Sequence, residues 1–172
     1  MRLLVATHAL LWWLTDNPRL SYAAETAIAD PDNDVFVSAC IGYEIAYKQR
    51  LGRLPALPES LTRRLEREGI GAMPVSLGHA LAAAALPGPH RDPWDRIMMA
   101  QALAEHCHVV TVDRVFADYN VPVLWQRGAL RGRGRCLFPP AAAGLHVARK
   151  GKPLSCIAGT LASRRTGMSQ PA

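Results

Sequence analysis

Four carboxylates in this sequence have the residue type and the placement to bind a divalent cation. Asp113 directly follows an apolar run that predicts a buried strand, and Glu44 lies in a helix predicted after another such strand. Asp92 and Asp95 open a helix behind a proline-rich break. Like charges that are held together repel unless a cation neutralises them, and sites made only of oxygen ligands suit Mg²⁺ or Mn²⁺. Such an ion lowers the pKa of a bound water and holds a phosphate for in-line attack.

Each of these side chains also has a purely structural interpretation. Asp92, followed by Pro93 and then by Asp95, has the pattern of a helix N-cap, and we favour a cap over a metal ligand for Asp92. Asp113 has the position of a turn residue after a strand, and Glu44 that of a solvated helix residue. Composition and spacing alone therefore indicate an α/β domain with a possible acidic site.

Alternating strands and helices predict the sheet that would bring these carboxylates together. The expected strands are Arg2–Ala6, Asp34–Ser38, Ala72–Val75, His108–Val112 and Val121–Trp125. The expected helices are His8–Leu14, Ser21–Ala29, Ala39–Arg50, Pro58–Gly69, Leu77–Leu86, Asp92–His106 and Val115–Tyr119, with Ser21 and Ser38 as caps. Because the strands are continuous apolar runs, they are typical of a parallel sheet covered on both faces. In such sheets the functional crevice lies beyond the carboxyl ends of the strands.

The net charge of +6 hides two segments of different character. Residues 126–172 contain nine Arg and Lys, no Asp or Glu, and seven of the thirteen glycines, whereas residues 1–125 hold 11 basic and 14 acidic side chains, a charge of −3. We therefore expect a domain at 1–125 and a disordered, basic, Gly- and Pro-rich tail at 126–172. An RNA-binding arm is one alternative for the tail, because mobile cationic chains attract phosphates, and a stretch appended by an altered reading frame is another.

Several classes of protein are not indicated. Every apolar run is interrupted before the roughly 18 residues that span a bilayer, and no small-residue cleavage site follows the N-terminal run, so neither a membrane nor a secretory leader is expected. The four cysteines are widely spaced and fit a reducing compartment better than a disulfide frame or a zinc site. The glycine loops of nucleotide-binding proteins and the nucleophile elbow of serine hydrolases are absent from the sequence. We expect a soluble cytoplasmic protein.

A set of motifs occurs together at spacings that resemble a known family. They are THALLWWL at residues 7–14, VSA at 37–39 with EIA at 44–46, LGRL at 51–54, HRDPWDR at 90–96 with AQA at 100–102, and VTVD at 110–113. This combination resembles the PIN-domain ribonucleases of the VapC toxin type over roughly residues 1–125. The resemblance implies a three-layer α/β/α fold with a central parallel sheet. It also implies an Mg²⁺- or Mn²⁺-dependent endoribonuclease that forms homodimers and is inhibited by a cognate antitoxin.

The resemblance carries the family's metal carboxylates onto Glu44, Asp95 and Asp113, with Asp92 as a nearby fourth carboxylate. Thr111 becomes a hydroxyl that supports these ligands.

Two further side chains lie beside this acidic group. Arg96 either positions phosphates or pairs with Asp92 and Asp95, and both alternatives are open. His8 is expected to pack near the crevice, with substrate contact as the alternative.

The sequence departs from the family at the position of the first metal carboxylate. Where the family has Asp at the end of the first strand, this chain has Ala6, whose methyl group cannot bind a metal. Removing even a group that only supports a metal ligand costs about 10–100-fold in metal affinity or activity, and a ligand itself should cost at least as much. Ile41 also replaces a frequent Ser or Thr, and Tyr43 replaces a common Trp.

Three functions follow from these observations. The first is a metal-assisted endoribonuclease that Ala6 impairs. The second is a catalytically inactive scaffold that keeps its binding surfaces for an antitoxin or RNA. The third is an RNA-binding protein whose basic tail makes most of the contacts.

Overall fold

The computed structural model describes residues 1–125, so the expected tail at 126–172 lies outside the described residues. The strands are β1 (Arg2–Val5), β2 (Asp34–Ser38), β3 (Gly71–Met73) and β4 (His108–Val110). The helices are α1 (Thr7–Leu14), α2 (Tyr22–Ala29), α3 (Ala39–Arg50), α4 (Leu61–Glu68), α5 (Leu77–Ala85), α6 (Pro93–Ala104) and α7 (Val115–Asp118).

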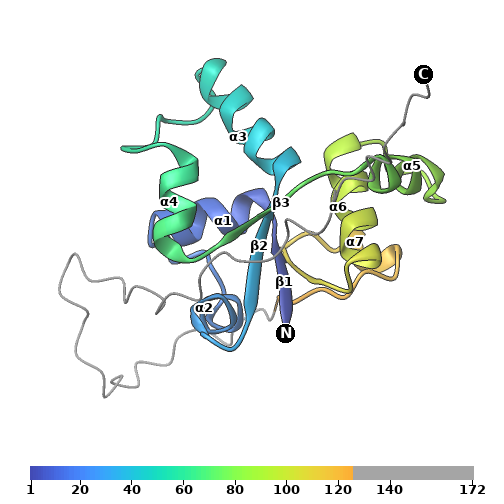
Figure 1. The fold of residues 1–172 in the computed structure, drawn as a ribbon, viewed down its shortest axis with the longest axis horizontal. Helices are drawn as coiled ribbons and strands as arrows, with labels where there is room; N and C mark the ends of the chain where they lie inside the picture. The colour runs from blue at the N-terminus through green and yellow to red at the C-terminus, as the bar shows by residue number, and fades with distance from the viewer. Residues whose placement is uncertain (126–172) are drawn as a thin grey trace, which may run out of the picture.

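The strands form one parallel sheet in the order β3-β2-β1-β4. Figure 1 shows this sheet at the centre, with α1, α2 and α4 on one side and α5, α6 and α7 on the other. Three successive residues of β1, Leu3, Leu4 and Val5, are fully buried, as expected for a strand covered on both faces. The predicted α/β fold with a parallel sheet between helices is confirmed.

The helix starts follow the capping side chains of the sequence. The side chains of Ser21 and Ser38 accept hydrogen bonds from the first turns of α2 and α3, as predicted. The predicted start of α4 at Pro58 is wrong, because Ser60 caps that helix and it begins at Leu61. The helix ends where predicted, at Gly69, which adopts the left-handed conformation with φ +66°.

Three strands end earlier than the sequence predicts, and the first ends at Val5 rather than Ala6 because Ala6 is already the N-cap of α1. The third was expected at Ala72–Val75 but ends at Met73, because Pro74 has no N–H to donate to a neighbouring strand. The fourth was expected to reach Val112 but ends at Val110, where Thr111 instead accepts a hydrogen bond from the backbone of Asp113.

The predicted fifth strand, Val121–Trp125, is wrong. Only a single bridge joins Val123 to Val109 within the described residues, although Pro122 and Leu124 both hydrogen-bond to the backbone of Val109. Pro122 cannot donate a hydrogen bond itself, which limits a ladder at this place.

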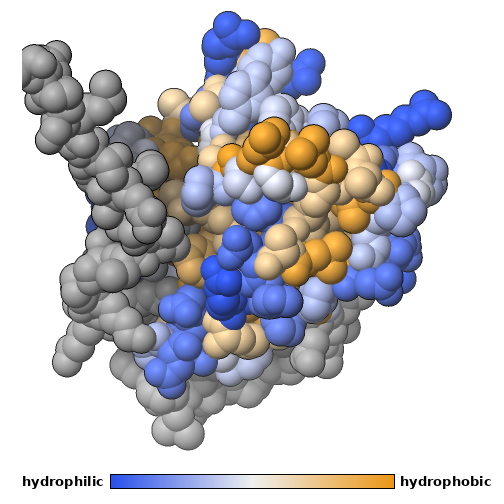
Figure 2. Space-filling model, turned by 45° about the vertical axis from the view of Figure 1, so that its right-hand side comes forward, coloured by the Kyte–Doolittle hydropathy of each residue, from blue (hydrophilic) through white to orange (hydrophobic). Residues whose placement is uncertain are grey.

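Part of the apolar surface is exposed over α5. Leu77 and Leu81 are 76% and 63% exposed, and the one ionisable side chain of this helix is the buried His79. Figure 2, which turns the side carrying α5 forward, shows apolar residues gathered in patches between hydrophilic ones. In the described part of the chain, no helix has the length and apolar character needed to cross a membrane.

Candidate active site

The carboxyl ends of the strands place the sequence-predicted acids at one edge of the sheet. The first residue after β1, Ala6, donates its backbone N–H to the carbonyl of Val110 at the end of β4, with N and O 3.1 Å apart. Asp113 follows three residues later. Glu44 comes from α3, which begins directly at the end of the neighbouring strand β2. The topology therefore directs all three chain segments to the same edge.

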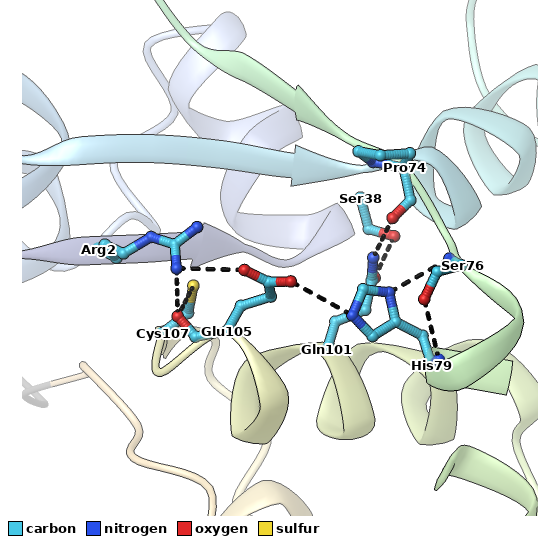
Figure 3. Close-up of polar contacts among 8 residues, drawn as sticks. All are labelled: Arg2, Ser38, Pro74, Ser76, His79, Gln101, Glu105 and Cys107. Atoms are coloured by element: carbon cyan, nitrogen blue, oxygen red, sulfur yellow. Dashed lines mark hydrogen bonds and ion pairs between the residues drawn. The ribbon is translucent and has the colours of Figure 1, made fainter. Parts of the chain in front are cut away.

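A buried hydrogen-bond network fixes α6 against this edge. Gln101 is fully buried, and its amide accepts a hydrogen bond from Ser38 at 2.6 Å and donates one to the carbonyl of Pro74 at 3.1 Å (Figure 3). Ser38 is also the cap of α3, the helix that carries Glu44. One side chain thus ties the helix of Asp95 to the helix of Glu44.

Asp95 lies in the first turn of α6, where a capping residue and a histidine surround it. Asp92 accepts hydrogen bonds from the backbone N–H groups of Trp94 at 2.9 Å and Asp95 at 3.4 Å, so the predicted cap is confirmed. His90 reaches back from the preceding loop and places its Nε2 3.0 Å from the Asp95 carboxylate. These contacts fix where the carboxylate points.

Burial raises the pKa of Asp95 above its ordinary value, and this is the largest effect on the group. The hydrogen bond from His90 and its charge act in the opposite direction, whereas the negative charges of Asp92 and Asp113 raise the pKa further. Asp92 and Asp113 therefore both lie close enough to Asp95 for their charges to act on it. Clusters of this kind are frequent at functional sites.

Glu44 is held by two partners rather than by solvent. Its carboxylate accepts a hydrogen bond from the hydroxyl of Thr7, the residue after Ala6, and forms an ion pair with Lys48 one helical turn later. Its side chain is 18% exposed, so the interpretation of Glu44 as a solvated helix residue is wrong.

Asp113 lies at an exposed turn that Thr111 organises. The hydroxyl of the buried Thr111 accepts a hydrogen bond from the Asp113 backbone at 3.1 Å, and the Asp113 carboxylate accepts one from Val115 at 3.0 Å. The turn role expected of Asp113 is confirmed, and its position at the strand end also keeps it near Asp95.

Arg96 has partners that neither alternative named. Its guanidinium donates to the backbone carbonyls of Ala83 at 3.0 Å, His90 at 3.1 Å and Leu86, at the end of α5 and in the loop that follows. These bonds hold the end of α5 and the His90 loop against the first turn of α6.

Ala6 and His8 lie where the chain passes from β1 into α1. Ala6 is buried and occupies the N-cap position of α1, where it supplies no side-chain hydrogen bond. The exposed ring of His8 lies 5.9 Å from the ring of Trp12, which agrees with a packing contact.

A pocket of about 570 Å³ opens beside His90, between the loop at residues 87–91 and α7. The hydroxyl of Tyr119 accepts a hydrogen bond from the His90 backbone at 3.1 Å and so supports this loop. Gly88 is needed here, because its φ is +94° and a Cβ would lie 2.6 Å from the Tyr119 hydroxyl.

The carboxylates suit a magnesium ion only if one or two of them bind it and water or substrate supplies the other ligands. Within residues 1–125, no three His, Cys, Asp or Glu side chains lie close enough to form a ready-made metal site. Mg²⁺ often takes one or two protein carboxylates and completes its coordination with water and substrate phosphates. Asp95 and Asp113 are the carboxylates that would form such a donor set, since the charge of Asp113 acts on Asp95, and their role as ligands, like that of Glu44, stays a prediction.

Three contacts of this site were not assigned from the sequence. Lys48 shares a helical face with Glu44, so the spacing gave a signal for their ion pair. His90 and Thr7 gave none, because a loop and a strand end bring them to Asp95 and Glu44 without any periodic pattern.

Comparison with known proteins agrees with this architecture. A model of the PIN domain matches residues 3–122. Ribonuclease VapC22 of Mycobacterium tuberculosis is 30% identical over 121 residues, which cover 69% of this chain and 92% of that protein.

The fold also matches a solved structure. The crystal structure of VapBC2 from Rickettsia felis, bound to a DNA fragment from its promoter, superposes with a TM-score of 0.53 at 17% identity, covering 73% of this chain and 98% of the other. Since the parallel sheet, the acidic edge and the sequence match all point the same way, the chain belongs to the PIN domain family, and within that family it is similar to the VapC ribonucleases.

Proposed function

We propose that this protein is a VapC-type endoribonuclease that hydrolyses RNA phosphodiester bonds with the help of Mg²⁺ or Mn²⁺, and that Ala6 impairs it. The observation that carries the proposal is that Asp92 and Asp113 lie near enough to the half-buried Asp95, at the carboxyl edge of a PIN-domain sheet, for their negative charges to raise its pKa. A group of like charges lowers stability, and a cation that binds there offsets that cost.

Each side chain has a definite part in this proposal. Asp95 and Asp113 would hold the ion, with Glu44 as the predicted third ligand. The ion supplies a bound water of lowered pKa and positive charge next to the phosphate. His90 fixes the orientation of the Asp95 carboxylate, and Thr7 fixes that of Glu44.

Ala6 explains why the ligand set is small. It directly follows β1, precedes Thr7 and is hydrogen-bonded to the end of β4, so an aspartate at this position would belong to the same edge of the sheet. Without that carboxylate, Lys48 is the cation that neutralises Glu44.

Ala6→Asp tests this proposal directly. We expect the native chain to cleave structured RNA weakly with Mn²⁺ or Mg²⁺ and not with EDTA, and Ala6→Asp to cleave at least about tenfold faster. Asp95→Asn introduced into the Ala6→Asp protein should abolish the cleavage, and gel electrophoresis of labelled RNA measures all of these rates. Absence of cleavage by both proteins with every metal would contradict the proposal.

The second candidate is an inactive scaffold that binds an antitoxin or RNA. Two observations favour it, the missing carboxylate at Ala6 and the ion pair that occupies Glu44. Cleavage by Ala6→Asp alone, with none by the native chain, would support this candidate.

We propose two protein partners for either function. The solved structural relative comes from a VapBC pair, which supports a cognate antitoxin. The uncharged face of α5 at Leu77 and Leu81 suits a second copy of the chain, because an interface that meets its own copy brings no like charges together. Light scattering after size exclusion, with Leu81→Glu as the variant, checks for this homodimer, and an unchanged mass would contradict it.

A further inference from the structure

A short series of aromatic rings leads away from the acidic edge. We call these three residues, Trp94, Tyr43 and Tyr47, the ring stack. The centroids of Trp94 and Tyr43 are 5.0 Å apart, and those of Tyr43 and Tyr47 are 5.8 Å apart with ring planes only 8° from parallel. The guanidinium of Arg50 lies 5.4 Å from the centroid of Tyr47 and extends the series by one planar group.

The ring stack is not part of the core. Tyr43 is 54% exposed and Tyr47 is 42% exposed, whereas the core aromatic residue Phe116 is 1% exposed. Folding therefore leaves about half of each tyrosine side chain accessible to water on one helix face, although the rings also contact one another, Trp94 and Arg50. Nucleobases stack on aromatic side chains that remain accessible in this way.

Two members of the ring stack are next in the sequence to proposed catalytic carboxylates. Trp94 directly precedes Asp95 at the start of α6, and Tyr43 directly precedes Glu44 on α3. Figure 1 shows α3 extending from the strand ends outward beyond the sheet, so the ring stack runs from the acidic edge along this helix.

The charges around the ring stack suit a polyanion. Lys48, Arg50 and Arg53 lie on the second half of α3 and just after it. The sole acid of α3 is Glu44, which Lys48 neutralises. Phosphates that pass along the outer half of this helix would therefore meet Arg50 and Arg53, which follow the Lys48–Glu44 ion pair along the chain.

We propose that the ring stack binds the bases of single-stranded RNA and holds the strand beside the carboxylates. The inference rests on the proposed function for the identity of the polymer, and it names the part of the strand that is recognised. An apolar protein segment is the alternative, because Leu51, one turn beyond Tyr47, is 42% exposed; Arg50 and Arg53 on either side of Leu51 favour a nucleic acid.

Binding without cleavage tests the ring stack. The full chain is titrated, in EDTA, into a fluorescein-labelled oligomer of uridine and into an abasic oligomer of the same length, and fluorescence anisotropy gives the affinities. The basic segment 126–172 is present in every variant, so its contacts with phosphates cancel in the comparison of the two oligomers.

The variants separate the aromatic faces from other effects. Tyr43→Ala with Tyr47→Ala removes both faces, Tyr43→Leu with Tyr47→Leu keeps apolar bulk without them, and Tyr43→Phe with Tyr47→Phe keeps the rings. Tyr22→Ala is the matched control, because Tyr22 is 77% exposed on α2. Circular dichroism melting checks that each variant is folded.

We expect the Ala and Leu pairs to bind the uridine oligomer about tenfold more weakly than the native chain and the abasic oligomer equally well. The Phe pair and Tyr22→Ala should bind both oligomers as the native chain does. Equal affinity of the native chain for the two oligomers would overturn the proposal, as would loss of self-association in place of RNA affinity.

The outcome for the ring stack is independent of the outcome for cleavage. Base-dependent binding without cleavage by Ala6→Asp leaves the ring stack in place and removes the nuclease. Cleavage by Ala6→Asp, with RNA binding unchanged in the Ala and Leu pairs, supports the nuclease and rules out the ring stack as an RNA site.

Discussion

The two halves of α6 carry polar groups of opposite character. In the second half, Gln101 is fully buried and both ends of its amide are paired, with Ser38 and with Pro74. In the first turn, Asp95 remains partly exposed among the like charges of Asp92 and Asp113. A completely paired buried network fixes position, whereas a crowded acidic group costs stability and has a use only when something binds to it. Because one helix carries both groups, the buried network around Gln101 can position the acidic group around Asp95.

Gln101→Ala should have the largest effect on stability. It leaves the hydroxyl of Ser38 and the carbonyl of Pro74 without their buried partner, and we expect the free energy of unfolding to fall by about 2–4 kcal/mol. Urea denaturation measures this loss. Gln49→Ala is the matched control, because Gln49 makes an exposed bond to Pro55, and it should change stability by less than about 0.5 kcal/mol. Similar losses of stability in the two variants would mean that the buried network of Gln101 is no more important than an exposed hydrogen bond.

Asp92 should have a smaller effect, and one that depends on the replacement. Asp92→Ala removes the cap of α6 and should lower the free energy of unfolding by about 1 kcal/mol. Asp92→Asn keeps a capping oxygen, so its stability should stay within a few tenths of a kcal/mol of the native value. The same denaturation experiment compares the two, and an equal loss in both would show that the charge rather than the cap matters.

Asp95→Asn should raise stability, and the gain should depend on pH. Because the pKa of Asp95 is raised in the folded protein, the unfolded chain loses this proton first as the pH increases past the ordinary value of 3.8. The free energy of unfolding therefore falls through that range and stays lowered at neutral pH. Asparagine removes this loss while keeping a hydrogen-bonding partner for His90.

The check is a pair of denaturation curves for the native chain and Asp95→Asn. The variant should be more stable near neutral pH, and the difference should disappear once the pH is below the ordinary pKa of aspartate. A difference of equal size under both conditions would mean that the raised pKa of Asp95 is not its origin. His90 contacts the Asp95 carboxylate, so His90→Gln in both backgrounds separates the contribution of this contact from those of burial and of the neighbouring carboxylates.

The sequence was most informative where a local rule decides the structure. The caps at Ser21, Ser38 and Asp92 were predicted correctly because each lies within three residues of the N–H groups it accepts from. The acidic positions at the strand ends followed from the alternation of strands and helices. The strand at 121–125 was predicted wrongly, because apolar residues do not reveal how far a neighbouring strand extends.

The partners of the acidic side chains could not be predicted in the same way. Arg96 was expected at a phosphate or a carboxylate, but it binds carbonyls at the end of α5 that lie ten to thirteen residues away. His90 reaches Asp95 only because Gly88 and Tyr119 shape the loop before it. Such contacts depend on the path of loops, which no apolar period encodes.

The guanidinium of Arg96 has a mechanical consequence. Arg96 directly follows Asp95 and donates hydrogen bonds to carbonyls at the end of α5. The outer face of α5 is apolar and carries no Asp, Glu, Lys or Arg. A partner that bound α5 and displaced it would either break these hydrogen bonds or move Asp95 together with the helix. Binding of a partner to the apolar face of α5 and the position of the Asp95 side chain are thereby coupled through Arg96.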